Sequence, residues 1–116
     1  MHGAMKIHHV LDRNRLRIEI SGEIEADSCR CLQSFWELRA GGRMDIEVDL
    51  GEAETGESDG LAVFTGLVEQ SLIAGARVQI VRAPQMLAHT LYKAGFLTRF
   101  PRLKLTSPRL EEPYQG

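Results

Sequence analysis

The fold is decided by the stretch DIEVDLGEAETGESDGLAVF, residues 45–64, which joins two segments of different hydrophobic period. Residues 45–50 alternate between acidic and apolar side chains, which predicts a strand with one polar face. After a loop over residues 51–56, apolar side chains recur at helical spacing, which predicts a helix from about Ser58 to Gly75. The apolar positions of this helix are Leu61, Phe64, Val68 and Leu72. A strand that leads through a loop into a helix is typical of α/β sheets.

The segments on either side also alternate between these two periods. Residues 5–11 and 16–20 predict two strands, and the short turn at residues 12–14 makes them an antiparallel hairpin. The other expected elements are a helix from Asp27 or Ser28 to about Arg39, a strand at Val78–Ile80, a helix from Pro84, placed in its first turn, to Gly95, and an edge strand at Leu103–Leu105.

This order of elements predicts the fold class. Because helices connect the later strands, at least part of the sheet should be parallel. The strands alternate apolar with polar residues, whereas strands covered on both faces are almost continuously apolar. We therefore predict an α/β fold, a two-layer sandwich whose mixed sheet of four to five strands has helices mainly on one face. The expected core includes Phe35, Trp36, Ile46, Val48, Leu61, Phe64, Leu72 and Ile80.

Length and charge limit the classes of protein that fit. The 116 residues suit one domain, which we expect over residues 1–106, followed by a flexible polar tail over residues 107–116. The 14 Lys and Arg against 16 Asp and Glu give a formal net charge of −2, which excludes a strongly basic nucleic-acid binder. No apolar run is long enough for a membrane span, and no apolar signal segment follows Met1. We therefore expect a cytoplasmic protein without membrane insertion.

Few side chains are arranged for catalysis or metal binding. Cys29 and Cys31 would point about 200° apart on a helix, so we expect neither a disulfide between them nor a zinc site. His8 and His9 are neighbours in a strand and should face opposite sides. The sequence contains no phosphate-binding glycine loop, nucleophile elbow or metalloprotease helix. We therefore expect no enzyme activity, no catalytic residue, no cofactor and no metal.

The junction between residues 49 and 61 is the most informative part of the chain for function. Ser58 is placed to cap the helix, and carboxylates near a helix N-terminus interact favourably with its dipole. A serine hydroxyl there is also exposed and could carry a phosphate. A purely structural cap and a modifiable serine both fit these residues. A third possibility is a divalent cation held by Glu25, Glu57 and Asp59.

Three short motifs, in this order and spacing, resemble those of the STAS domain, the module of bacterial anti-sigma-factor antagonists. The first is GEIEADS at residues 22–28, and the second is ESDGL at residues 57–61. The third is Gly75, which precedes the apolar strand at Val78–Ile80. The resemblance covers about residues 6–96 and implies an α/β sandwich that acts in regulation.

In those antagonists, a kinase that is also the anti-sigma factor phosphorylates the first serine of the second motif. The resemblance places this serine at Ser58 and implies a surface that docks an anti-sigma factor, a serine kinase or another regulatory protein. The partner-binding residues that it implies are Glu23, Glu25, Asp27, Glu57, Ser58, Asp59, Gly60 and Leu61.

Three residues depart from the family pattern. Glu25 and Glu57 stand where the family has aspartates, and Asp59 stands where it has a small residue. These carboxylates fit two outcomes: a standing acidic surface that partly imitates the phosphorylated state, or a family member whose partner does not use phosphorylation. They also fit a second kind of STAS protein, the accessory subunit of an ABC-type lipid transport complex, which binds an ATPase without a phosphoserine. In either role we expect a monomer or a homodimer.

Overall fold

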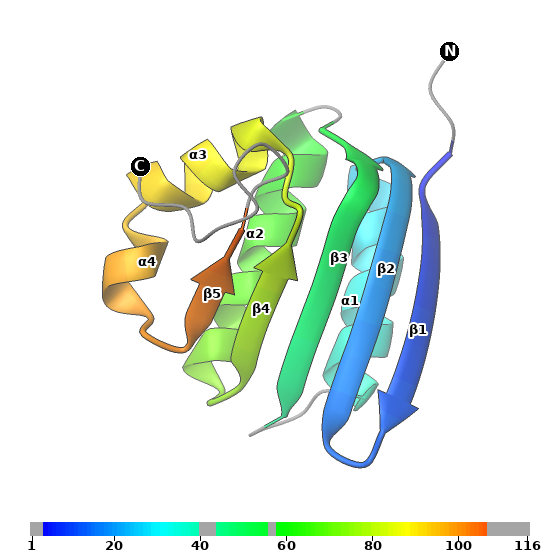
Figure 1. Ribbon diagram of the computed structural model, residues 1–116. Helices are drawn as coiled ribbons and strands as arrows, with labels where there is room; N and C mark the ends of the chain where they lie inside the picture. Colours follow the sequence, from blue (N-terminus) through cyan, green and yellow to red (C-terminus); the bar gives the residue numbers. More distant parts are fainter. Residues whose placement is uncertain (1–3, 40–43, 56–57, 107–116) are drawn as a thin grey trace.

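The computed structural model describes the backbone of residues 4–39, 44–55 and 58–106, and their side chains except those of residues 35–39 and Ser58. Within these residues, five strands form one sheet that is accompanied by four helices (Figure 1). The strands are β1 (Lys6–Asp12), β2 (Arg15–Glu23), β3 (Asp45–Glu54), β4 (Arg77–Val81) and β5 (Leu103–Leu105). The helices are α1 (Ala26–Arg39), α2 (Ser58–Ile73), α3 (Gln85–Lys93) and α4 (Phe96–Arg99).

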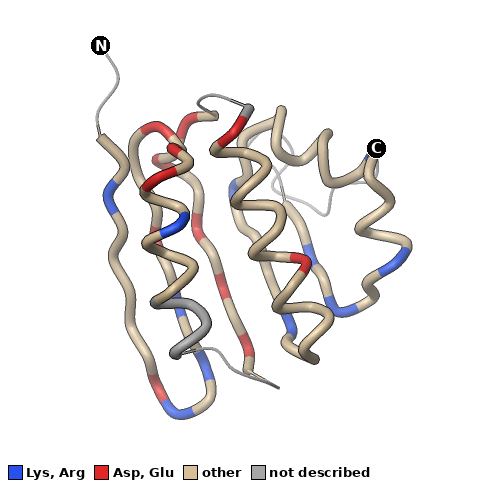
Figure 2. The backbone as a smooth tube through the Cα atoms, turned by 180° about the vertical axis from the view of Figure 1, so that it is seen from behind, with Lys and Arg blue, Asp and Glu red and all other residues tan. Residues whose placement is uncertain are grey.

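The strands lie in the sheet in the same order as in the chain, from β1 to β5. β1 and β2 form the predicted antiparallel hairpin, and each later strand is parallel to the one before it. α1 and α2 lie side by side behind the sheet in Figure 1 and in front of it in Figure 2, which is seen from behind. These observations confirm the predicted α/β fold with a mixed sheet and helices on one face.

The period-2 pattern of the strands explains this layering. Apolar side chains of β2, β3 and β4 alternate with polar ones and point toward the helices, where they form the core. Of the predicted core residues, those whose side chains the structure describes are all buried: Ile46, Val48, Leu61, Phe64, Leu72 and Ile80. The side chains of Phe35 and Trp36 lie outside the described part of the chain.

β2 and β3 are both longer than predicted. They keep pairing beyond a register irregularity between Glu19 and Ser21, so that β2 reaches Glu23 and β3 reaches Glu54. Residues 51–54, predicted as a loop because of their glycine and acidic side chains, therefore belong to a strand. The parallel neighbour supplies the hydrogen bonds that the local sequence alone does not suggest.

The chain after β4 also differs in detail from the prediction. α3 begins at Gln85, so Pro84 stands at the position before the helix instead of in its first turn. The short helix α4 was not predicted, and it begins with Phe96, which is buried. The expected tail over residues 107–116 lies outside the described residues. In the described ranges, no helix is both long and apolar enough to cross a membrane.

Candidate functional site

Two loops meet at the carboxyl end of the parallel strands, where β2 leads into α1 and β3 leads into α2. The backbone N–H of Ile24, directly after β2, donates a hydrogen bond to the carbonyl oxygen of Glu54, the last residue of β3, at 3.0 Å. Because β2 and β3 are parallel neighbours, the helices that follow them begin at the same edge of the sheet. Figure 2 shows Asp and Glu residues gathered at this end.

A depression of about 470 Å³ lies between the first turns of α1 and α2. Four of its side chains are carboxylates, and one, that of Arg30, is a cation. Arg30 donates to the Asp27 carboxylate at 2.8 Å, and both side chains are exposed. We call this surface the acidic depression. It is lined by Glu23, Ile24, Glu25, Ala26, Asp27, Arg30 and Asp59.

Gly60 allows α2 to approach the β2–α1 loop closely. A Cβ atom at this position would lie 2.5 Å from the carbonyl oxygen of Ile24, and this oxygen belongs to the backbone and cannot swing aside. The next residue, Leu61, is 9% exposed and belongs to the core. These two members of the predicted partner-binding set are therefore buried, and neither lines the depression.

The structure brings together the other described members of the predicted set. The side chains of Glu23, Glu25, Asp27 and Asp59 all line the acidic depression. α2 begins at Ser58, as predicted, but the Ser58 side chain lies outside the described part of the structure, and so does Glu57. Arg30 was not among the predicted residues, although its i,i+3 spacing from Asp27 on a helix is a recognisable signal for an ion pair.

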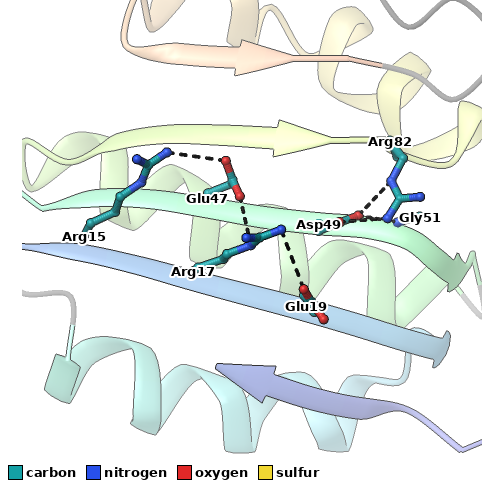
Figure 3. Close-up of polar contacts among 7 residues, drawn as sticks. All are labelled: Arg15, Arg17, Glu19, Glu47, Asp49, Gly51 and Arg82. Carbon is teal, nitrogen blue, oxygen red and sulfur yellow. Dashed lines mark hydrogen bonds and ion pairs between the residues drawn. The ribbon is translucent and has the colours of Figure 1, made fainter. Parts of the chain in front are cut away.

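A second polar cluster lies at the same end of the sheet, on its open face (Figure 3). The Arg82 guanidinium donates two hydrogen bonds to the Asp49 carboxylate, at 2.8 and 3.2 Å. The Gly51 N–H donates to the same carboxylate at 2.9 Å. Burial alone would raise the pKa of Asp49, but the hydrogen bonds from Arg82 and Gly51 outweigh it and hold the pKa below its ordinary value.

Arg82 and Gly51 fit each other closely in this cluster. Arg82 adopts a left-handed backbone conformation, with φ of 55°, and its N–H donates to the Thr106 hydroxyl at 3.1 Å. A Cβ atom at Gly51 would lie 2.2 Å from the carbon of the Arg82 guanidinium. Sequence reasoning missed this cluster because Asp49 and Arg82 are 33 residues apart and meet only through β3–β4 pairing.

Four other polar residues of the open face form a ladder across β2 and β3. A carboxylate oxygen of Glu47 lies 3.6 Å from a guanidinium nitrogen of Arg15, and the other lies 3.2 Å from one of Arg17. A second Arg17 nitrogen lies 3.7 Å from a carboxylate oxygen of Glu19 (Figure 3). Opposite charges on adjacent strands stabilise the sheet modestly. We therefore assign these residues a structural role.

Possible metal ligands and cysteines are also present among the described residues. No group of three His, Cys, Asp or Glu among them is placed to hold a metal ion, and Glu57 of the proposed cation set is outside them. Burial raises the pKa of Cys29 to about 11, so its thiol stays protonated near neutral pH. Cys31 is exposed, and neither cysteine forms a disulfide.

Solved structures of anti-sigma-factor antagonists share this fold. One from Mycobacterium paratuberculosis is 20% identical, with a TM-score of 0.60 over 92% of this chain and 88% of that one. The phosphorylated form of the Bacillus cell fate determinant SpoIIAA is 13% identical, with a TM-score of 0.62 over 91% and 94%. An antisigma-factor antagonist STAS domain from Rhodobacter sphaeroides is 16% identical, with a TM-score of 0.54 over 66% and 85%.

These identities are low, so the structural likenesses bear on the fold alone. No curated protein sequence matches the chain closely enough to count as a relative. A family model described as "Mlab, STAS domain", however, matches residues 7–104, which is most of the chain. The chain therefore belongs to the STAS domain family.

Proposed function

We propose that this protein is a regulatory interaction module that docks an anti-sigma factor or serine kinase through the acidic depression and the adjoining start of α2. The observation that carries the proposal is the gathering of four carboxylates, from two separate loops, around one depression beside Ser58. STAS domains resembling anti-sigma-factor antagonists act on regulatory protein partners, and four of the seven residues that line this depression carry carboxylates.

The lining of the depression suits electrostatic binding of a protein surface. Its described side chains offer four carboxylates and one guanidinium, all of them charged groups. A carboxylate cluster of this kind complements a partner surface that carries Lys and Arg. Such complementarity accelerates association and selects the partner.

Ser58 would act as the switch within this surface. A phosphate on its hydroxyl adds a charge of about −1.5 to −2. The cations of a docked partner are matched to the carboxylates already present, so the added charge has no counterion and must be desolvated on binding. Phosphorylation, or its imitation by Ser58→Asp, should therefore weaken docking.

The experiment compares wild type, Ser58→Ala and Ser58→Asp against purified histidine-kinase-fold serine kinases encoded near this protein. Calorimetry measures affinity, and phosphate transfer is followed by mass spectrometry. Ser58→Asp should weaken binding while the fold stays intact, because an aspartate at a helix start retains an acceptor and favours the dipole. Ser58→Ala should lower stability by about 0.5–2 kcal/mol and abolish phosphate transfer. Equal affinity of wild type and Ser58→Asp removes Ser58 from the site.

A second candidate is an accessory subunit that docks an ABC-type ATPase through the same surface without phosphorylation. Asp59 favours it, because this exposed carboxylate directly follows the serine and repels an added phosphate. Co-purification with an ATPase subunit encoded nearby, together with the absence of phosphate transfer to Ser58, would establish this role. A chain that binds the kinase and ignores the ATPase would exclude it.

A further inference from the structure

β1 is a long, open edge of the sheet. It pairs with β2 in a regular register over seven residues, from Lys6–Ser21 to Asp12–Arg15, and in the described part of the chain no strand lies on its other side. It contains no proline, and two of its apolar side chains are exposed, Val10 by 51% and Leu11 by 41%. The opposite edge, β5, has only three residues. Edge strands of this kind are templates for pairing with another chain.

The sequence of β1, KIHHVLD, is complementary to itself when it runs antiparallel to a second copy. In the register centred on His9, all seven residues pair, and Lys6 of each copy lies opposite Asp12 of the other. Ile7 lies opposite Leu11 on the helix side of the sheet, and His8 lies opposite Val10 on the open face. Ile7 and Leu11 are on the helix side because, within the chain, they lie opposite Ile20 and Leu16 of β2. Those two residues are buried in the core beneath the helices.

The Lys6–Asp12 and Ile7–Leu11 pairs each stabilise an antiparallel sheet. Opposite charges and apolar side chains directly across two strands contribute favourably, whereas like charges there are destabilising. Shifting the register by two residues in either direction removes both Lys6–Asp12 contacts and leaves strand residues without a strand partner. The two copies are related by a twofold axis, so each contributes the same patch to the interface. Dimers of this symmetry are the commonest protein oligomers.

We propose that two copies of this chain associate through β1, in the register centred on His9, so that their two sheets become one continuous sheet with the helices on one side. This inference goes beyond the proposed function and does not depend on it. The acidic depression is lined by the β2–α1 loop and the start of α2, so it stays available in the dimer. Since the strands are antiparallel, the two depressions would face opposite ends.

The test is a charge-swap series on the full chain, with the dissociation constant of the dimer measured by sedimentation equilibrium at low salt. Lys6→Asp places an aspartate opposite Asp12 of the other copy, at two places in the dimer. Within its own sheet Lys6 faces the uncharged Ser21, so the substitution creates no like-charge pair there. We expect this variant to raise the dissociation constant by about tenfold or more. Lys104→Asp, on the remote strand β5, is the matched control with the same change in charge and should shift it by less than about twofold.

The double variant, Lys6→Asp with Asp12→Lys, distinguishes this register from general charge effects. It recreates an opposite-charge pair at both positions and should restore the dissociation constant to within about threefold of wild type. Asp12→Lys places a lysine opposite Arg15 of the same chain, and this pair of like charges destabilises the hairpin. Thermal melting must therefore first show that the double variant is folded. A wild-type chain that stays monomeric at all soluble concentrations overturns the proposal. A double variant that is folded and no tighter than Lys6→Asp also overturns it.

Discussion

At the scale of single residues, Gly60 and Gly51 both lie where another group comes too close for a side chain. The group is backbone at Gly60 and a side chain at Gly51. A side chain at Gly60 would meet the backbone of Ile24, whereas one at Gly51 would meet the flexible Arg82 guanidinium. Backbone cannot move without displacing the loop, but a guanidinium can swing away. Gly60 therefore shapes the site itself, and Gly51 only permits the Asp49–Arg82 pair.

Gly60→Ala should lower the free energy of unfolding by about 1–3 kcal/mol, because the new methyl group overpacks against the Ile24 carbonyl. The matched control is Gly66→Ala in the same helix, where an added Cβ meets nothing within 4 Å. This control should raise stability by about 0.5–1 kcal/mol through the better helix propensity of alanine. Urea unfolding of both variants checks the prediction, and equal effects would contradict the close approach.

Asp49 should make stability depend on pH at the acid end. Its folded pKa lies below the ordinary value of 3.8, so its contribution is fully present above that value and is lost as pH falls through the folded pKa. Asp49→Asn should therefore melt below wild type at neutral pH, and the gap should shrink as pH approaches 2. Melting curves across this range test the sign. A gap that is constant with pH would show that the carboxylate charge plays no part.

Among the helices and strands, those set by the spacing of apolar residues were predictable from the sequence. The parts that form only by pairing with a neighbouring strand were not. The helix over α2 and the strand over the first half of β3 could be read from the spacing of apolar residues. The extension of β3 to Glu54 could not, because GEAE at residues 51–54 becomes a strand only beside β2. The acidic residues of the site were predictable from the motifs. Arg30 carries a local signal outside the motifs, its i,i+3 spacing from Asp27, whereas Arg82 meets Asp49 only through the pairing of β3 with β4.

The attachment of α2 to the sheet can be tested at its first turn. Leu61→Ala removes a core side chain next to the site and should cost about 2–5 kcal/mol. Ile73→Ala, at the other end of the same helix, truncates a side chain that is 68% exposed and should change stability by less than about 0.5 kcal/mol. Chemical denaturation of both variants gives the comparison. Similar losses would mean that the buried face of α2 is assigned wrongly.

At the scale of the whole molecule, charge is distributed unevenly although the net charge is only −2. Asp and Glu gather at the end where α1 and α2 begin, while Lys and Arg predominate along α4 and its neighbouring loop (Figure 2). A balanced total thus conceals a local field at the site, which the composition alone could not reveal. Salt at 0.1 M screens this field over a distance of about 10 Å.

Docking should therefore weaken as salt concentration rises. Exposed carboxylates attract an oppositely charged partner over a distance that ions screen, so the association rate should fall more than the dissociation rate rises. Surface plasmon resonance at several sodium chloride concentrations separates the two rates for whichever partner binds. Rates that are insensitive to salt would place the interface on an apolar surface instead.

The most direct test of docking at the acidic depression is the affinity of that partner for Asp59→Lys and Glu69→Lys. Both substitutions lie on α2 and change the charge equally, but Asp59 lines the depression, whereas Glu69 pairs with Arg99 at 3.1 Å. We expect Asp59→Lys to weaken binding by about tenfold or more, and Glu69→Lys to weaken it by less than about twofold. Equal weakening by both variants, or none by Asp59→Lys in a folded protein, would contradict it.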